Sequence, residues 1–487
     1  MPPEAPDTPP QPKIGADEWV ASHGSRREGV GGPLGHLRER IAALPLPVLF
    51  GAFGIAAALV PLFTNNGYYL QVGFDTLTYM LLALGLNVVV GFAGLLDLGY
   101  VAFFGFGAYG YGMLASAQFG IHWPTLAILP IVVAATVLLG FLVALPSRRL
   151  VGDYLAIVTL FFGQLFVTVA DNGQRISLFG LTRTYNVTNG PNGIVNIDQF
   201  HLFGLHLVSL ASNFYAALVF FLVVLAAVYL VSTSRTGRAW RSLREDPLAA
   251  ELMGMPVNRL KLLAFAFGAG VAGLSGTLFA SEHTNVFSSD FDTPLLIMVY
   301  AILILGGAGS IGGVILGALV VNVTLEVLRT PDHATWLFFT LLLATLLVKL
   351  RPWRVLVGVL AGMLAFGFAV HAIVGAVWSP GVHGSGAVTG TLGRALSHWV
   401  PLPPNPIPAG NYAFVGLVVL ILVVTSVRPL WRNILFAPML YLATFVWDAR
   451  LGFEPSVTRQ ILIGVILIVL MNARPQGLLG ETRVEIV

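Results

Sequence analysis

The sequence predicts an all-α protein that crosses a membrane many times. Of its 487 residues, 56% are hydrophobic and only 10% are charged, whereas a soluble domain carries about 25% charged residues. Apolar runs recur along most of the chain, each near the ~20 residues that a helix needs to cross a bilayer. Lipid offers no partners for backbone N–H and C=O groups, so such runs form helices. The expected fold class is a polytopic helical membrane bundle.

About fourteen apolar segments qualify as spanning helices. They lie near residues 41–63, 74–92, 98–118, 124–145, 152–171, 212–232, 260–281, 292–306, 311–328, 336–350, 354–376, 411–427, 433–448 and 457–471. Residues 1–40 are rich in proline, glycine and charge and have no apolar periodicity, which predicts a disordered tail. The first apolar run begins near Ile41, too far from Met1 for a cleaved signal peptide.

The basic residues predict the orientation of the chain. With residues 1–40 placed in the cytoplasm and the segments alternating, about 20 of the 26 lysines and arginines fall on the cytoplasmic side. Basic loops beside spanning helices stay in the cytoplasm. The N-terminus and the C-terminal tail are therefore both expected to be cytoplasmic.

One polar stretch, Ser234–Lys261, interrupts the apolar chain and carries six basic residues. Asp246 suits the N-cap of a helix, the proline after it suits the first helical position, and Gly254 suits the residue after the last turn. This predicts a short helix, Pro247–Met253, on the cytoplasmic face, where a soluble partner can grip it. The alternative is an ordinary basic connector between two spans.

Two connections between apolar segments are short and rich in glycine. We name them the first corner, residues 91–99, and the second corner, residues 306–310. Glycine tolerates the backbone of a broken helix, and transport sites are often built on such breaks. The corners are therefore expected to border a transport path, the alternative being two tight turns at the membrane surface. Asp97, in the first corner, is expected to cap free backbone N–H groups.

Small residues spaced four apart predict close packing of the helices against each other or against a partner chain. Two such rows occur: Gly268, Ala272 and Gly276, and Gly309, Gly313 and Gly317.

Several classes of function are excluded. None of the three lysines follows a glycine, so the sequence has no phosphate-binding loop of the usual kind, and any ATP must be hydrolysed by another subunit. The sequence has no cysteine, and no nucleophile–base pair or metal-ligand cluster occurs at a useful spacing. A net charge of +3 does not indicate nucleic-acid binding. The G-x-G-x-x-G pattern at 307–312 lies in a membrane span, which argues against a dinucleotide site.

Several stretches together resemble the permeases of branched-chain amino acid ABC importers, and specifically their LivM-type subunit. The likeness covers roughly residues 75–330 and 455–482. It is carried by LALGLNVVVGFAGLLDLGYVAFFGFGAYGYG (82–112), GDYLAIVTLFFGQ (152–164), TNGPNGI (188–194), the polar stretch and its continuation to Leu278, LGGAGSIGGVILGA (305–318) and MNARPQGLLG (471–480).

The resemblance implies a bacterial inner-membrane subunit without catalytic, metal or cofactor sites of its own. Its expected partners are two cytoplasmic ATPase subunits, a second, LivH-type permease, a periplasmic binding protein and membrane lipid. The expected ATPase-coupling residues are Arg238, Arg241, Arg244, Asp246, Pro247, Leu248, Ala249, Ala250, Met253 and Gly254. The expected translocation pathway runs near Asn87, Gly91, Gly94, Asp97, Gly306 and Gly309.

Two alternatives stay open. Urea and short-chain amide importers use similar permeases, and the binding protein does much of the selection. An ion-coupled secondary transporter would act alone, but it would need carboxylates in mid-membrane and no docking helix.

The sequence departs from the family pattern in two places. Residues 1–40 are extra, and residues 331–450 replace a link that is usually short. We expect four added spans in this insert, with PLPPNPIPAG (401–410) in an outer loop, beside about ten core spans. The expected domains are therefore the tail 1–40, a permease core 41–330 with its coupling loop 233–261, the insert 331–450, and a final span with its cytoplasmic tail, 451–487.

Overall fold

The computed structural model describes residues 46–64, 66–147, 152–174, 176–177, 184–202, 205–206, 209–349, 353–384, 386–388, 390–426, 429–473 and 477–479. The predicted disordered tail, residues 1–40, lies outside the described residues. Six of the lysines and arginines that the predicted orientation places in the cytoplasm also lie outside the described residues, namely Arg148, Arg149, Arg351, Arg428, Arg474 and Arg483.

Two compact units make up the chain. The first contains α3 (Leu46–Phe63), and the second begins at Thr64. The core helices of the second unit are α4 (Gly67–Leu86) with its π-helical continuation η1 (Asn87–Phe92), α5 (Tyr100–Leu114), α6 (Thr125–Ser147), α7 (Asp153–Asn172), α8 (Leu210–Thr233), α9 (Arg235–Glu245), α10 (Pro247–Leu252), α11 (Val257–His283), α12 (Thr293–Gly306) and α13 (Ile311–Val327).

Each of the fourteen predicted apolar segments contains a helix in the described part of the chain. By length and composition, eight of the described helices can cross a membrane. The count is nine if α13 and α14 (Pro331–Lys349), which bend by 119° at their junction, are taken as one span. The polytopic helical class is confirmed. The division into ten core and four inserted spans stays a prediction.

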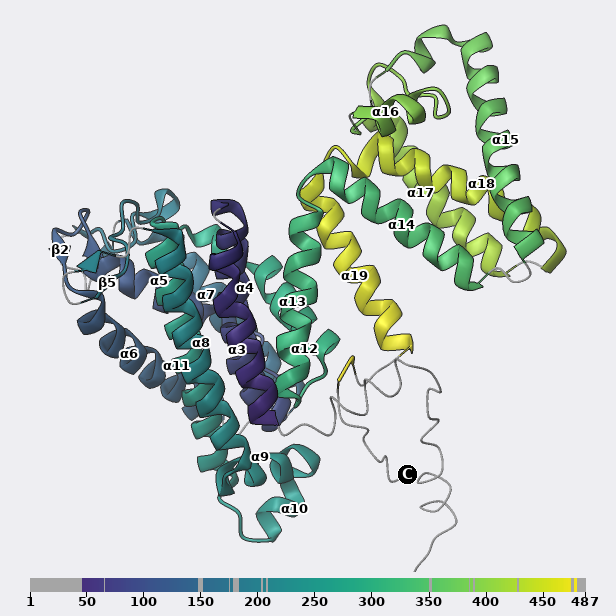
Figure 1. Ribbon diagram of the computed structural model, residues 1–487. Helices are drawn as coiled ribbons and strands as arrows, with labels where there is room; N and C mark the ends of the chain where they lie inside the picture. Colours follow the sequence, from purple (N-terminus) through teal and green to yellow (C-terminus); the bar gives the residue numbers. More distant parts are fainter. Residues whose placement is uncertain are drawn as a thin grey trace, which may run out of the picture. The chain divides into compact units, whose positions relative to one another are not determined.

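α11 packs against α4, α5 and α6 (Figure 1). Its glycines bring helix backbones into contact, because a Cβ at Gly276 would lie 2.8 Å from the backbone nitrogen of Ala108 in α5. The carbonyl of Gly268 accepts a hydrogen bond from the Tyr100 hydroxyl at 3.2 Å. The predicted close packing through this row of small residues is confirmed.

α12 and α13 form an antiparallel hairpin. Gly306 lies against Gly313, and a turn further on Gly317 lies against Ile302. A Cβ at Gly317 would lie 3.0 Å from the Gly306 nitrogen, so the second row of small residues also serves close packing. The second corner is thus a tight turn between two antiparallel helices, the geometry that the sequence left open as the alternative to a broken helix.

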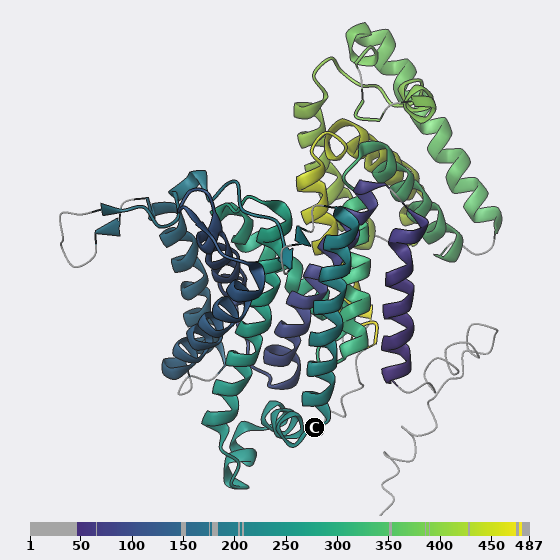
Figure 2. The ribbon, with the colours of Figure 1, turned by 60° about the vertical axis from the view of Figure 1, so that its left-hand side comes forward.

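Short β-hairpins occur in the loops that lie away from α9 and α10 (Figures 1 and 2). Their antiparallel pairs are β1 (Ala115–Ser116) with β2 (Ile121–His122), β3 (Ile176–Ser177) with β4 (Thr184–Tyr185), and β5 (His201–Leu202) with β6 (Leu205–His206). The loops also contain the 3-10 turns η3 (Gly190–Asn192) and η4 (Ser288–Phe291). Ile194 pairs with Val286 across two loops that are distant in sequence.

The insert has a hydrophobic core of its own. The insert comprises α14, α15 (Trp353–Val377), η5 (Ser379–Val382), α16 (Gly390–Ser397), α17 (Pro406–Ser426), α18 (Pro429–Val446) and η6 (Trp447–Leu451). Trp399 is central to this core: its ring meets Tyr441 edge-on at 5.2 Å, and its Nε1 donates to the Leu364 carbonyl at 3.1 Å.

The expected outer loop 401–410 is shorter than predicted, because α17 begins at Pro406. The first-turn N–H groups of a helix have no intrahelical acceptor. Pro406 and Pro408 therefore leave no helical hydrogen bond unmade there. The proline content was taken as a loop signal, and this boundary was wrong.

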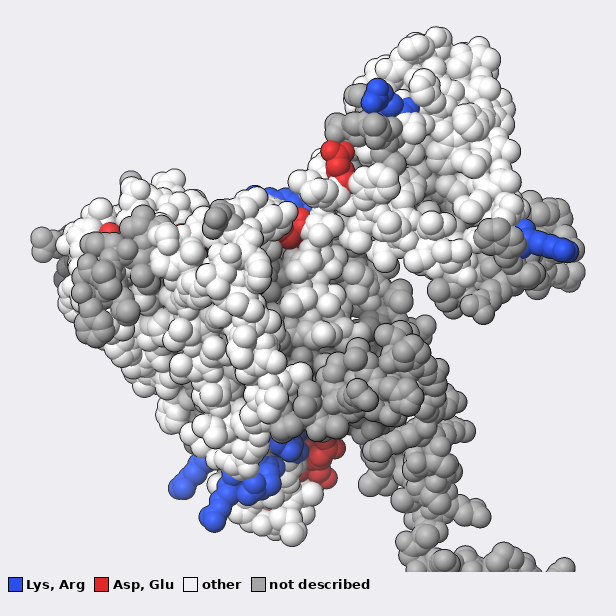
Figure 3. Space-filling view, viewed as in Figure 1, with Lys and Arg blue, Asp and Glu red and all other residues white. Residues whose placement is uncertain are grey.

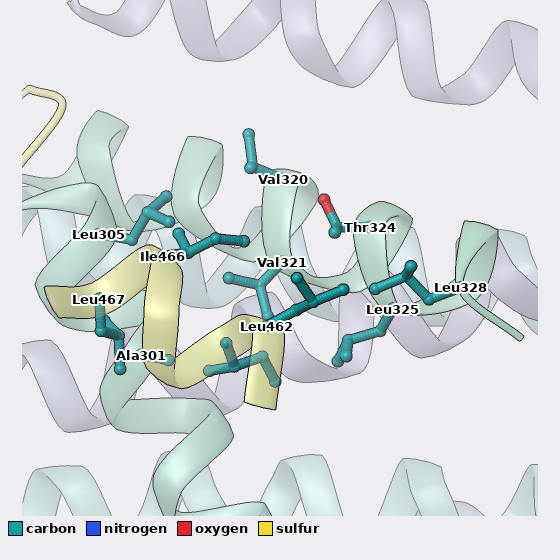
Figure 4. Close-up of a pocket in the computed structure, with 11 residues that line it drawn as sticks. Ala301, Leu305, Val320, Val321, Thr324, Leu325, Leu328, Leu462, Ile466 and Leu467 are labelled. Atoms are coloured by element: carbon teal, nitrogen blue, oxygen red, sulfur yellow. The ribbon is translucent and has the colours of Figure 1, made fainter. Parts of the chain in front are cut away.

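α19 (Pro455–Ala473) returns to the core after the insert and packs against α12, and its side chains border a crevice beside α13 (Figure 4). Leu305, Val321 and Leu462 line a crevice of about 20 Å³ between the three helices. The cavity holds about one water molecule at most. The helix that follows the insert therefore contacts α12, which precedes the insert.

Candidate functional site

α9 is an amphipathic helix whose apolar face is fixed against the rest of the bundle. Gly237, Trp240 and Leu243 are buried, at the spacing of one helical face. The Trp240 indole Nε1 donates to the Leu260 carbonyl in the first turn of α11 at 2.9 Å. α9 is thereby attached to the start of α11.

Two of the predicted coupling arginines contact the end of α8. Arg238 donates to the Thr233 carbonyl at 2.8 Å, and Arg241 donates to the Ser232 carbonyl. Carbonyls in the last turn of a helix have no intrahelical partner, and they attract cations. Both arginines therefore cap α8, while remaining exposed at the edge of α9.

The short helix predicted after Asp246 is present as α10, with Met253 as its C-cap. The Asp246 carboxylate accepts from the backbone N–H groups of Leu248 and Ala249, at 2.8 and 3.0 Å. Gly254 follows the helix with a φ of +80°, the left-handed conformation that favours glycine there. The predicted capping of this helix is confirmed.

α10 exposes large apolar side chains at a polar end of the molecule. Leu248, Leu252 and Met253 are 68%, 80% and 81% exposed, whereas Ala250 is buried. Figure 3 shows basic side chains gathered at the end of the molecule that carries α9 and α10, with acidic side chains beside them. The exposed ones are Arg235, Arg238, Arg241 and Arg259. We name the exposed set Leu248, Leu252 and Met253 the docking face.

The two glycine corners touch each other. The Asn87 side-chain oxygen accepts from the Gly309 backbone N–H at 2.8 Å. A Cβ at Gly91 would lie 2.6 Å from the same backbone nitrogen. The structure thus brings together Asn87 and Gly91 from the first helix end with Gly309 from the second.

Asp97 is buried in the first corner and satisfies one free backbone N–H there, but it is not the cap of α5, whose N-cap residue Gly99 has no side-chain cap. Asp97 Oδ1 accepts from the Gly99 backbone N–H at 3.0 Å, immediately before α5. The Tyr300 hydroxyl of α12 donates to the Asp97 carbonyl at 2.6 Å, and Thr159 of α7 accepts from the Leu98 N–H at 2.9 Å. Neighbouring helices therefore hold this corner on two sides.

The second corner is completed by residues near the end of the described chain. Leu478 and Leu479 donate to the carbonyls of Leu305 and Gly306, at 2.8 and 3.1 Å. Gly477 packs so closely that a Cβ on it would lie 2.6 Å from Gly307. Carbonyls at the end of α12 thus obtain partners from a segment far along the sequence.

Arg244 lies at the meeting point of the two corners. Its Nη1 donates to the Gly91 carbonyl and, at 3.5 Å, to the Ala308 carbonyl. Its side chain also packs against Gly94. Among the predicted coupling arginines, Arg244 therefore points inward, toward the residues predicted for the translocation pathway.

Some residues of this site were not identified from the sequence. Leu252 was omitted from the coupling set, although its position one turn after Leu248 on a short helix is a usable signal. Thr159, Tyr300 and the 477–479 segment were quoted at most as parts of motifs. Their hydrogen bonds to the corners are long-range and carry no local signal.

Other features of the described residues do not suggest a cofactor. No group of three or more His, Cys, Asp or Glu side chains is placed to hold a metal ion in the parts of the chain that the structure describes. A recess of about 510 Å³ between α5, α6 and α7 is lined almost wholly by apolar side chains, including Phe106, Met113 and Phe166. The polar side chains in this lining are the hydroxyl-bearing Tyr109, Thr136 and Thr188.

A family model described as the permease component of the branched-chain amino acid transport system matches residues 68–350, more than half of the chain. The chain belongs to this family. The permease is thus a multi-pass membrane protein of a bacterial transport system. The match includes both corners, α9 and α10.

Individual relatives agree with the family match. The high-affinity branched-chain amino acid transport system permease protein LivM of Escherichia coli K12 is 38% identical over 303 residues, which are 57% of this chain and 67% of that protein. LivM of Salmonella typhimurium is 36% identical over 324 residues, 62% of this chain and 72% of the relative. LivH of Escherichia coli K12 is 26% identical over 301 residues, 58% and 94% of the two chains. No solved structure gives a significant match.

Proposed function

We propose that this permease carries branched-chain amino acids, or closely related ones, inward across the bacterial inner membrane. It does so as one subunit of an ATP-binding cassette importer. The printed names of the LivM and LivH relatives, which describe branched-chain amino acid transport, support this substrate class.

The energy comes from separate cytoplasmic ATPase subunits, since the sequence has no phosphate-binding loop. A periplasmic binding protein delivers the amino acid, and a second, LivH-like permease completes the pathway. The basic end that carries α9 and α10 faces the cytoplasm. By alternation of the spans, the N-terminus faces the cytoplasm as well.

The observation that carries the proposal is the docking face of α10. Three large apolar side chains exposed on a capped helix, beside exposed arginines, form a surface that a soluble protein can cover. A loop that only connects two spans has no need to expose Leu252 at 80%. An ATPase subunit that grips α10 would transmit its closure to the attached helices.

The translocation pathway is proposed to pass beside the two corners, at the interface with the second permease. Asn87 Nδ2 and Asp97 Oδ2 are buried there without a hydrogen-bond partner among the described residues. Each such group costs about 1–3 kcal/mol. A polar solute that passes these groups can supply the missing partners.

A substitution on the docking face tests the proposal. Leu252→Gln keeps a good helix former and removes apolar contact, so we expect leucine uptake to fall about tenfold, the effect of losing about 1.4 kcal/mol at an interface. The measurement is radiolabelled leucine uptake and ATP hydrolysis by the complete complex in liposomes. Arg394→Gln, a change at an exposed arginine of α16 in the insert, is the matched control and is expected to be neutral. Full uptake by Leu252→Gln would contradict docking through α10.

A pull-down from native membranes in mild detergent tests the assembly itself. We expect a phosphate-loop ATPase and a second permease to co-purify with the tagged chain. The chain alone, or only copies of itself, would favour a secondary transporter. Urea or short amides that outcompete leucine in the uptake assay would change the substrate class.

A further inference from the structure

Arg244 stands at the boundary between the docking segment and the bundle. It lies in the last turn of α9, two residues before Asp246, the N-cap of α10. A displacement of α10 therefore reaches the Arg244 backbone directly, through two intervening peptide units. The side chain is half-buried, unlike those of Arg238 and Arg241, which are exposed.

The guanidinium of Arg244 contacts two carbonyls that come from different helix ends. Gly91 belongs to the last turn of η1, and Ala308 follows the end of α12. Both carbonyls lie at the negative end of a helix, where a cation is stabilised. A guanidinium has five N–H donors in a rigid fork, so it can hold two acceptors in a fixed relation.

Glycines in both corners leave the space that the Arg244 side chain occupies. A Cβ at Gly94 would lie 2.9 Å from Arg244 Cγ, and a Cβ at Gly309 would lie 2.6 Å from its Nη1. Both glycines also have positive φ angles, +69° and +93°. Any other residue at either position would be strained in its backbone and would crowd the arginine.

The two corners are also joined to each other without Arg244. Asn87 accepts from the Gly309 N–H, and the backbones of Gly91 and Gly309 are in contact. A displacement of one corner should therefore displace the other, because closely packed backbone atoms are nearly incompressible.

We propose that Arg244 is a positioning residue that couples α10 to both glycine corners, so that a movement of the docking helix displaces the ends of η1 and α12 together. This inference rests on the proposed function, because it takes the docking of an ATPase on α10 as the source of the movement. It assigns Arg244 an intramolecular role in place of contact with the partner.

The absence of native cysteine makes a direct test possible. Ala308→Cys places one thiol in the half-buried second corner, in a chain that has no other. The rate of its reaction with a maleimide is measured in the complete complex with its ATPase subunits, once without nucleotide and once after trapping with ATP and vanadate. The quantity of interest is the ratio of the two rates, which reports movement of the corner.

We expect this ratio to differ from one in the Ala308→Cys chain. Adding Arg244→Met should bring this ratio to about one while ATP hydrolysis continues, because the movement of α10 would no longer reach the second corner through the Arg244 side chain. Arg244→Lys keeps the charge with a single donor group, so it should retain part of the difference. This second variant tests the proposal even if Arg244→Met folds poorly. Arg394→Met, at an exposed site in α16 of the insert, should leave the ratio unchanged.

The outcomes separate the two proposals. A ratio that survives Arg244→Met, or that equals one in the Ala308→Cys chain itself, overturns the role of Arg244 and leaves the proposed function standing. A purified complex without any ATPase overturns the proposed function and this inference with it. A merely structural role for Arg244 would lower the yield or change both rates equally, without altering the ratio.

Discussion

Within the apolar windows of the helices, 83% of α11 and 78% of α4 with η1 are buried, against 11% of α15 and 11% of α17 in the insert. The core achieves its burial through glycines that let backbones touch, as Gly276 does against α5. The insert is held by large aromatic side chains such as Trp399 and Trp447. Helix packing in the core thus depends on glycines, which have no side chain to keep the backbones apart. Packing in the insert depends on a few large aromatic side chains.

The largest expected effect comes from filling a backbone contact in the core. Gly276→Leu places a side chain where a Cβ would overlap the Phe104 carbonyl oxygen and lie 2.8 Å from the Ala108 nitrogen. Both are backbone atoms that no rotamer change can move, so the cost exceeds the range of about 1–3 kcal/mol that is typical of side-chain overpacking, and the two helices can no longer pack. We expect no monodisperse protein on size-exclusion chromatography in detergent. The matched change Gly358→Leu, in α15 at a position with no neighbour within 4 Å, should give the normal yield. Equal yields from the two variants would contradict the conclusion that the core, unlike the insert, depends on backbone contacts at glycine.

A smaller effect is expected at Trp447 in the insert. Its ring stacks on Phe338 at 4.4 Å, and its Nε1 donates to Thr335 at 2.9 Å. Trp447→Ala should lower stability by about 3–5 kcal/mol. Trp447→Phe keeps the stacking and should lose only about 1 kcal/mol, the value of one hydrogen bond. Thermal unfolding followed by fluorescence measures both, and leucine uptake by the Phe variant should persist. Uptake lost in the Phe variant would show that the insert is part of the transport machinery.

The smallest effect is expected from reporters fused within the insert, which test its topology. A fusion after Arg354 should be cytoplasmic and one after Arg394 periplasmic, because a helix able to cross the membrane, Leu356–Val377, lies between them. A pair of reporters with opposite compartment requirements measures this. Both sites on one side would contradict the assignment of α15 as a span.

The sequence was most informative where structure is determined locally. The Asp246 cap, the proline after it and Gly254 define α10 within nine residues, and the structure differs only in ending the helix at Leu252. The apolar segments likewise predicted the helices, because the length and hydrophobicity of each segment can be read without reference to the rest of the chain. The boundary at Pro406 failed because proline is compatible with both a loop and a first helical turn.

Long-range contacts were beyond the sequence. The two corners could be recognised as similar, but their contact joins Asn87 to Gly309, 222 residues apart. Arg244 was assigned to the docking surface by its position in a basic stretch. Its contact with Gly91, 153 residues away, gives no periodic or compositional signal. The direction of such a side chain depends on segments that are distant in sequence, so the sequence of α9 alone does not predict it.

The hydrogen bonds from Leu478 and Leu479 to the second corner have a consequence for biogenesis. Residues 305 and 306 leave the ribosome long before residues 478 and 479, and the whole insert is synthesised in between. The carbonyls of Leu305 and Gly306 therefore lack these two hydrogen-bond donors while the insert is synthesised. These two hydrogen bonds can form only after residues 478 and 479 have been synthesised. A chain truncated before Gly477 would insert its helices and yet leave this corner unfinished.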